Sequence, residues 1–146
     1  MVRSCLGERA VREVIEVAMR DDTRVITHSK FRMWLRPDGI VEVVWAPRST
    51  ARLEDARAAL DAMAELTGGR RSPLLVDMRD TGAQDGPTRA AWASRADLVS
   101  ATALIVDTPL SRIAGNLFIN MSRPATPTRL FDSKDSALAW LRGLTS

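Results

Sequence analysis

Two groups of polar residues could meet at one edge of a sheet. Each group directly follows a short apolar run: Asp77, Arg79 and Asp80 the first, then Asp107, Thr108 and Arg112 the second. Because parallel strands end at the same edge, we expect the two groups to converge there. Thr108 would cap the next helix, whose free N–H groups could hold a phosphate or carboxylate together with Arg112. The alternative is structural, with an Asp77–Arg112 ion pair and Thr108 acting only as a cap.

Asn116 completes the candidate ligand-binding residues. It lies in an otherwise apolar stretch that begins at Pro109 and has helical spacing. A polar side chain there either bonds to a loop backbone or makes a polar contact in a self-association interface.

The chain offers little material for catalysis. His28 is the only histidine and Cys5 the only cysteine, so a nucleophile paired with a base has few groups to use. The sequence also has no metal-ligand spacing, nucleophile elbow or phosphate-binding glycine loop. We therefore expect a protein that is not an enzyme and binds no metal and no cofactor.

Composition limits the other classes. A length of 146 residues is that of one domain, and the apolar runs are far too short to cross a bilayer. A single cysteine and no signal-peptide pattern favour the cytoplasm. The net charge is only +3 and the arginines alternate with acids, whereas nucleic-acid binders cluster them. We expect neither membrane insertion nor nucleic-acid binding.

The patterns predict a hairpin followed by alternating helices and strands. Two strand-like runs, 23–35 and 40–45, flank the turn Arg36–Gly39, and the second alternates between a core face and a partly wet face at Ile40, Glu42 and Val44. Further strands are predicted at 74–78, 103–107 and 129–131. Strands alternating with helices indicate an α/β fold with a mixed, largely parallel sheet and an N-terminal hairpin.

Helical spacing predicts the remaining elements. An amphipathic helix over 9–19 forms an N-terminal arm, residues 1–22, outside a single domain at 23–146. Ser49 or Thr50 is expected to cap a helix that runs to about Leu66. Later helices are predicted over 88–96, over 109–120 and after Asp132 or Ser133. The inward stripe of the 109–120 helix is expected to comprise Leu110, Ile113, Ala114, Leu117, Phe118 and Met121.

Three segments, taken with the order of elements, resemble a known family: Ser72–Asp77, Thr108–Phe118 and Thr128–Leu141. Over residues 23–146 the chain resembles the bacterial SpoIIAA-like (STAS/SEC14-type) small proteins, closest to an uncharacterised actinobacterial branch. The resemblance implies the SpoIIAA-like fold and, in many relatives, self-association as a dimer. Relatives that antagonise anti-sigma factors carry a phosphorylatable Ser after an Asp. Here Gly86 follows Asp85, and Thr88 is the nearest hydroxyl and the weak phosphorylation candidate.

Two functions from different classes follow. The first is a non-catalytic regulatory or protein-interaction module that docks onto itself or a protein partner and does not depend on Ser phosphorylation. The second is a small-ligand protein that binds an anionic or lipid-like molecule with the carboxyl-edge loops. An exposed apolar patch on the N-terminal helix or the hairpin would favour the first. A mostly apolar pocket with Thr108 and Arg112 at its mouth would favour the second.

Overall fold

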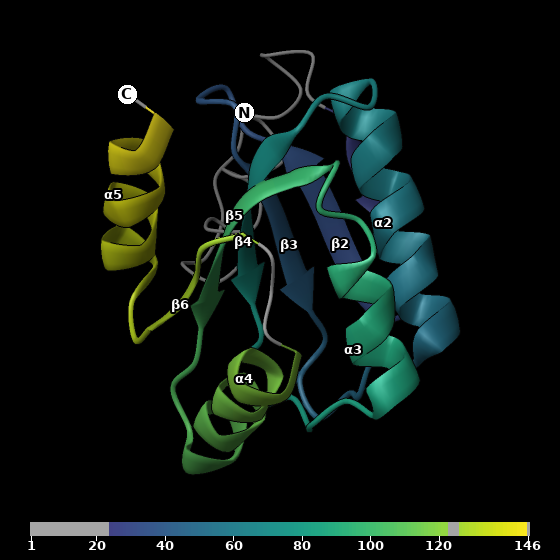
Figure 1. The fold of residues 1–146 in the computed structure, drawn as a ribbon, viewed down its shortest axis with the longest axis vertical. Helices are drawn as coiled ribbons and strands as arrows, with labels where there is room; N and C mark the ends of the chain where they lie inside the picture. The colour runs from purple at the N-terminus through teal and green to yellow at the C-terminus, as the bar shows by residue number, and fades with distance from the viewer. Residues whose placement is uncertain (1–23, 123–125, 146) are drawn as a thin grey trace, which may run out of the picture.

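The computed structural model describes residues 24–122 and 126–145, which form a six-stranded sheet with helices on both faces (Figure 1). The strands are β1 (Val25–Thr27), β2 (Phe31–Leu35), β3 (Val41–Trp45), β4 (Ser72–Asp77), β5 (Val99–Ile105) and β6 (Thr128–Phe131). The helices are α2 (Leu53–Thr67), α3 (Gly86–Ala93), α4 (Pro109–Ser122) and α5 (Lys134–Thr145). The helix predicted over 9–19, and with it the 1–22 arm, lies outside the described residues.

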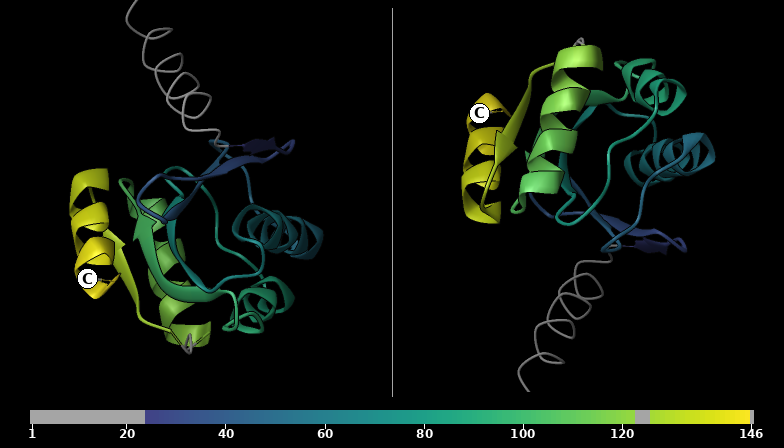
Figure 2. Two further views of the ribbon diagram at one scale, coloured as in Figure 1. Left: turned by 90° about the horizontal axis from the view of Figure 1, so that it is seen from above. Right: turned by 90° about the horizontal axis from the view of Figure 1, so that it is seen from below.

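The strands lie in the sheet in the order in which they occur in the chain. β1, β2 and β3 are antiparallel, and β3 to β6 are parallel. Right-handed connections between neighbouring strands taken in chain order place every connecting helix on the same face. α2, α3 and α4 share that face, and α5 packs on the other (Figure 2). The predicted α/β class, with a mixed, largely parallel sheet, is confirmed.

The predicted hairpin turn at Arg36–Gly39 is present and joins β2 to β3. The strand predicted before it is wrong in extent. At the Arg36–Gly39 turn, the Gly39 N–H donates to the Arg36 carbonyl at 3.0 Å, and Gly39 has a φ of 85°. The run 23–35 is two strands, because the His28 N–H donates to the Phe31 carbonyl at 2.8 Å and closes a tight turn. The imidazole of His28 then stacks on the Phe31 ring, with centroids 4.5 Å apart.

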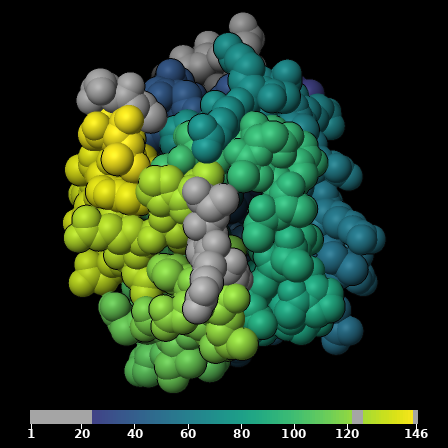
Figure 3. Space-filling view, in the orientation of Figure 1, coloured from purple at the N-terminus to yellow at the C-terminus, as the bar shows by residue number. Residues whose placement is uncertain are grey.

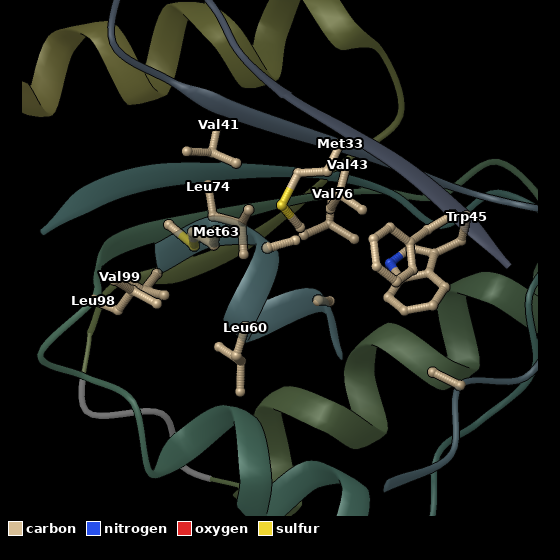
Figure 4. Close-up of a cluster of buried hydrophobic side chains, with 14 of the residues drawn as sticks. Met33, Val41, Val43, Trp45, Leu60, Met63, Leu74, Val76, Leu98 and Val99 are labelled. Atoms are coloured by element: carbon tan, nitrogen blue, oxygen red, sulfur yellow. The ribbon is translucent and has the colours of Figure 1, made fainter. Parts of the chain in front are cut away.

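The main core lies between the sheet and α2, α3 and α4. Alternate side chains of β2, β3 and β4 point into it and meet the apolar stripe of α2 (Figure 4). Its fully buried members include Met33, Val41, Val43, Leu60 and Met63. Burial of side chains of this size contributes about 1.5–3 kcal/mol each, so this layer supplies most of the hydrophobic stabilisation.

The second face of β3 is drier than predicted at the end nearest α5. Ile40 packs in one cluster with residues of α5 and is only 1% exposed, whereas Val44, farther along the strand, is half-buried. Glu42 is 3% exposed, and its carboxylate is neutralised by Arg36 Nη1 at 2.9 Å and by Lys134 Nζ at 2.8 Å. A buried charge is tolerated only with such partners. The alternation of the two faces along β3 is as predicted. It carries no information about α5, which lies about 90 residues later in the chain and supplies the partner of Glu42.

The start of α2 also differs from the prediction. Ser49 donates its hydroxyl to the Ala46 carbonyl at 2.6 Å, and the helix begins only at Leu53. Asp55 accepts the Arg52 N–H at 2.9 Å and the Lys30 ammonium at 2.7 Å, so it ties the β1–β2 turn to the helix start. Burial alone would raise the pKa of Asp55, but these hydrogen bonds outweigh it and lower the pKa below its ordinary value.

α4 presents a different face to the sheet from the one predicted. Ser111, Ala114 and Gly115 are buried, whereas Leu110, Ile113 and Met121 are 55%, 61% and 61% exposed. The reason is a close approach at Gly115, where a Cβ atom would lie 2.6 Å from Leu130 Cδ2 on β6. The helix rests on its small residues, Leu117 and Phe118 are half-buried, and Leu110, Ile113 and Met121 turn away from the sheet.

We expect Asp55→Asn to lower the free energy of unfolding at pH 7 by about 1 kcal/mol, because the charged bonds to Lys30 and to the helix start are lost. The pKa of Asp55 is lowered on folding, so its contribution is complete above the unfolded pKa of about 3.9 and is lost as the pH falls through the folded value. Urea unfolding should therefore separate variant and wild type at pH 7 but not near pH 2. Asp61→Asn, an exposed site on the same helix, is the matched control and should change little at either pH.

We expect Gly115→Ala to be less favourable than Gly143→Ala by about 1 kcal/mol or more. Both positions are helical, but a Cβ at Gly143 meets nothing within 4 Å, whereas at Gly115 it displaces the Leu130 side chain. Thermal unfolding of the two variants measures the difference. Equal gains in stability would show that α4 does not rest closely on β6.

Candidate functional site

At the carboxyl edge of β4, Asp77 pairs with Arg79. The carboxylate and guanidinium form two bonds, 2.9 Å from Nε to Oδ1 and 2.6 Å from Nη2 to Oδ2. The hydrogen bond to Asp77 raises the pKa of Arg79, and the charge of Asp107 on the next strand end adds to it. The charged groups at the ends of β4 and β5 are therefore close enough to interact. The predicted Asp77–Arg112 pair is wrong, because the carboxylate of Asp77 already has its partner two residues away.

Thr108 caps α4, as the structural alternative held. Its Oγ1 accepts the Ser111 N–H at 3.0 Å. The Ser111 hydroxyl, which is fully buried, accepts the N–H groups of Asp107 at 3.2 Å and Thr108 at 3.1 Å. The N–H groups that the sequence offered to an anion are thus engaged in part by the chain's own side chains.

The other predicted residues do not join this pair. Arg112 and Asn116 are exposed on α4, and within 24–122 and 126–145 neither side chain makes a hydrogen bond or ion pair. Asp80 has a φ of 63°, and its carbonyl accepts the Arg48 N–H at 2.7 Å, which joins the loops after β3 and β4. The six candidates thus surround the same edge without forming one binding site.

Thr88 lies in the first turn of α3 and is fully buried. Asp85 caps this helix by accepting the Thr88 N–H at 2.9 Å and the Thr88 hydroxyl at 2.6 Å, and these bonds lower the pKa of Asp85. A kinase would reach this hydroxyl only after the helix start had opened. The geometry gives phosphorylation at Thr88 no support.

A cavity that the sequence did not reveal lies between the sheet, α3 and α4. Its volume is about 80 Å³, and Figure 3 shows the surface hollowed beside α3. Its lining is mostly apolar and includes Trp45, Leu74, Trp92, Leu104, Leu117 and Phe118. The loops after β3 and β4 supply Ser49, Thr81 and Gln84, so the predicted carboxyl-edge loops do take part, but Thr108 and Arg112 do not.

Several polar groups of this cavity come from α3 and the loop before it. Gln84 Oε1 accepts the indole N–H of Trp92 at 3.0 Å, and the Arg89 guanidinium donates to the Gln84 carbonyl. Trp92 also meets Trp45 edge-on, with centroids 6.3 Å apart. The signal in the sequence was a tryptophan on a short, alanine-rich helix, where neighbouring side chains are too small to fill the space around it.

The second candidate surface is the outward face of α4, which we call the α4 stripe: Leu110, Ile113 and Met121, with Leu117 half-buried beside them. These residues recur at helical spacing and therefore share one side of the helix. They are three of the five large hydrophobic residues that are exposed in the described residues. Such a concentration is typical of a surface that contacts another molecule.

Other chemistry finds little support. His28 accepts the Lys30 N–H with its Nδ1 at 3.1 Å and stacks on Phe31, and it does not line the cavity. Within the part of the chain that the structure describes, no group of three histidine, cysteine, aspartate or glutamate residues could hold a metal ion. In the same part, no helix has the length and apolar character needed to span a membrane.

Three solved structures are similar to the chain. An uncharacterised protein of the DUF3478 family with a SpoIIAA-like fold, from Shewanella loihica PV-4, is 16% identical, with a TM-score of 0.47 over 82% of this chain and 91% of that one. An anti-sigma factor antagonist from Mycobacterium paratuberculosis is 15% identical, with a TM-score of 0.49 over 82% and 92%. A protein of unknown function from Arthrobacter sp. FB24 is 29% identical, with a TM-score of 0.29 over 75% and 96%. The first two descriptions agree with the resemblance stated from the sequence, but likenesses of this size carry no information about activity.

No curated protein matches the chain. A family model, described as a domain of unknown function, DUF7793, matches residues 33–145. The match runs from β2 to the end of α5, so it includes the cavity and the α4 stripe but not β1. The chain therefore belongs to the DUF7793 family.

Proposed function

We propose that this protein is a non-catalytic interaction module that associates with a second copy of itself through the α4 stripe. The observation that carries the proposal is the exposure of Leu110, Ile113 and Met121 on one side of a single helix. Burying side chains of this kind contributes about 1.5–3 kcal/mol each. In the isolated domain these three side chains stay exposed to water. A partner that covers them would gain the free energy of their burial.

The shape of the α4 stripe suits a symmetric dimer. A two-fold axis crossing the helix would bring the stripe of one copy against the same stripe of the other, and every contact would occur twice. The stripe from Leu110 to Met121 is about 16 Å long at 1.5 Å per residue. Arg112 and Asn116 lie beside it and supply the polar rim that surrounds the apolar centre of most interfaces. This arrangement also gives Asn116 its predicted place in a self-association interface.

The absence of catalysis in this proposal rests on the groups that are already engaged. His28 is the only histidine of the chain, and its ring is held by Lys30 and Phe31. Two of the acids near the cavity and the carboxyl edge, Asp77 and Asp85, act as an ion-pair partner and a helix cap. The buried Thr88 hydroxyl supports a module that is not switched by phosphorylation there.

Light scattering over a range of concentrations should show a dimer for the wild type, and Ile113→Asp should weaken its dissociation constant roughly 100-fold or more, because the lost burial counts twice in a symmetric interface. Thermal stability should change little, since Ile113 is 61% exposed in one copy. Asn116→Asp introduces the same charge beside the stripe and is the matched control, with a much smaller effect. A wild type that stays monomeric at every concentration would contradict self-association.

The cavity supports a second function, the binding of a small amphiphilic carboxylate. Trp45, Trp92 and Leu104 would surround its apolar part. Two cations line the cavity, Arg89 and Arg95, and Arg95 is already paired with Asp97. A space of about 80 Å³ between packed layers is much larger than the space one water molecule requires, and apolar walls favour an apolar occupant. This site uses the loops after β3 and β4, but it lies on the α2 side of the sheet.

For this second function, linear carboxylates from butanoate to decanoate should change the intrinsic fluorescence, because Trp45 and Trp92 line the cavity. Arg89→Gln should weaken binding about tenfold or more, as expected when a charge-assisted hydrogen bond is lost. Arg112→Gln removes the same charge from the position predicted by sequence and should leave binding unchanged. Equal weakening by both variants would place the anion at the carboxyl edge, and no fluorescence change with any member of the series would exclude the site.

A further inference from the structure

The cavity between the sheet, α3 and α4 has polar groups at two places along the strands. Toward the carboxyl edge these are the amide of Gln84 and the guanidinium of Arg89. Toward the amino ends of the strands lie two threonines, Thr102 on β5 and Thr128 on β6. Leu104, two residues farther along β5, also lines the cavity and is apolar. A molecule in this cavity therefore has an apolar wall at its middle and polar groups at its two ends.

The register of the sheet gives the separation of these two places. Leu74 lies opposite both Val41 and Thr102, so the threonines are level with the first residue of β3. Trp45 is the last residue of the same strand, four residues farther along, and it also lines the cavity. At about 3.3 Å per residue this separation is about 13 Å. The indole that meets Trp45 edge-on donates to Gln84, so Gln84 lies at the far end from the threonines.

The two threonines are direct neighbours across β5 and β6. Thr102 and Thr128 are partners in the parallel register, where strands are about 4.8 Å apart, and both line the cavity. The Thr128 hydroxyl donates its hydrogen to the Thr126 carbonyl at 3.1 Å, so it can only accept a further hydrogen bond. Within residues 24–122 and 126–145 the Thr102 hydroxyl makes no hydrogen bond, so it can donate and accept.

We propose, resting on the second function above, that the carboxylate bound in this cavity carries a hydroxyl group at its far end, held by Thr102 and Thr128. A ligand hydroxyl can donate to Thr128 and accept from Thr102, which pairs all three hydroxyls. A methyl group at the same place would leave the half-buried Thr102 hydroxyl without a partner, at a cost in free energy. The ligand class is a linear hydroxycarboxylate.

The end at the carboxyl edge suits the carboxylate. Gln84 Oε1 already accepts the Trp92 indole N–H, so the amide has only its NH2 group left to offer. The Arg89 guanidinium donates from Nη1 to the Gln84 carbonyl and has further N–H groups on its other nitrogens. Two groups that only donate match a charged acceptor better than a hydroxyl.

Arg95 also lines the cavity, and its pairing disfavours a second carboxylate at the threonine end. Its Nε and Nη2 atoms lie 3.1 and 3.4 Å from the two carboxylate oxygens of Asp97. The positive charge of Arg95 is therefore already balanced by a neighbour two residues away. A neutral hydroxyl needs no further cation, whereas a second carboxylate would require one.

Fluorescence titrations with hexanoate, octanoate and decanoate, each compared with its terminally hydroxylated form, test the proposal. The best-bound hydroxylated acid should bind about tenfold more tightly than its parent, because it pairs the Thr102 hydroxyl. Equal affinities within every pair would overturn the proposal and leave the second function standing. No response to any acid would overturn both. Tighter binding of the dicarboxylate of the same length would also overturn the hydroxyl assignment, because it would require a cation at the threonine end.

Variants of the threonine pair locate the hydroxyl. Thr102→Val replaces the side-chain hydroxyl with a methyl group and should abolish the preference for the hydroxylated acid, whereas Thr102→Ser keeps the hydroxyl and should keep the preference. Thr27→Val, at an exposed position of β1 outside the cavity, is the matched control. Because both ligands are compared on the same variant, a loss of folded protein cannot imitate the result. A preference that persists in Thr102→Val would overturn the proposal.

Discussion

The contact between Gly115 and Leu130 is the constraint on which the exposed surface of this domain depends. A helix that crosses a sheet at a glycine can approach more closely than one that rests on larger side chains, and here a Cβ at Gly115 would displace the Leu130 side chain. Ser111, Ala114 and Gly115 form the buried face of the helix, so Leu110, Ile113 and Met121 lie on the side that faces the solvent.

The same geometry explains the cavity. α4 is close to β6, but α3 is only eight residues long and has alanines on much of its surface, so the space between the two helices above β4 and β5 is not filled. Trp92 reaches into this space and is held by Gln84. Close packing at one end of the layer thus leaves a mostly apolar void at the other, with Arg89 and Arg95 at its lining.

Local patterns in the sequence were sufficient for the elements and the sheet, because alternation, helical spacing and turn residues act over a few neighbours. They were insufficient where a distant segment decides the outcome. Glu42 is buried only because Lys134 and α5 come back over it, and α4 turns its stripe outward only because Leu130 meets Gly115. The partner of Asp77 differs from the expected one for a simpler reason, since Arg79 lies only two residues away and holds its carboxylate.

The distribution of exposed apolar side chains separates the roles of the two sheet faces. The main core is complete without Leu110, Ile113 and Met121, so stability of the domain does not require these residues to be apolar. On the other face, Val25 and Trp34 are paired across β1 and β2, and Trp34 lies opposite the buried Glu42.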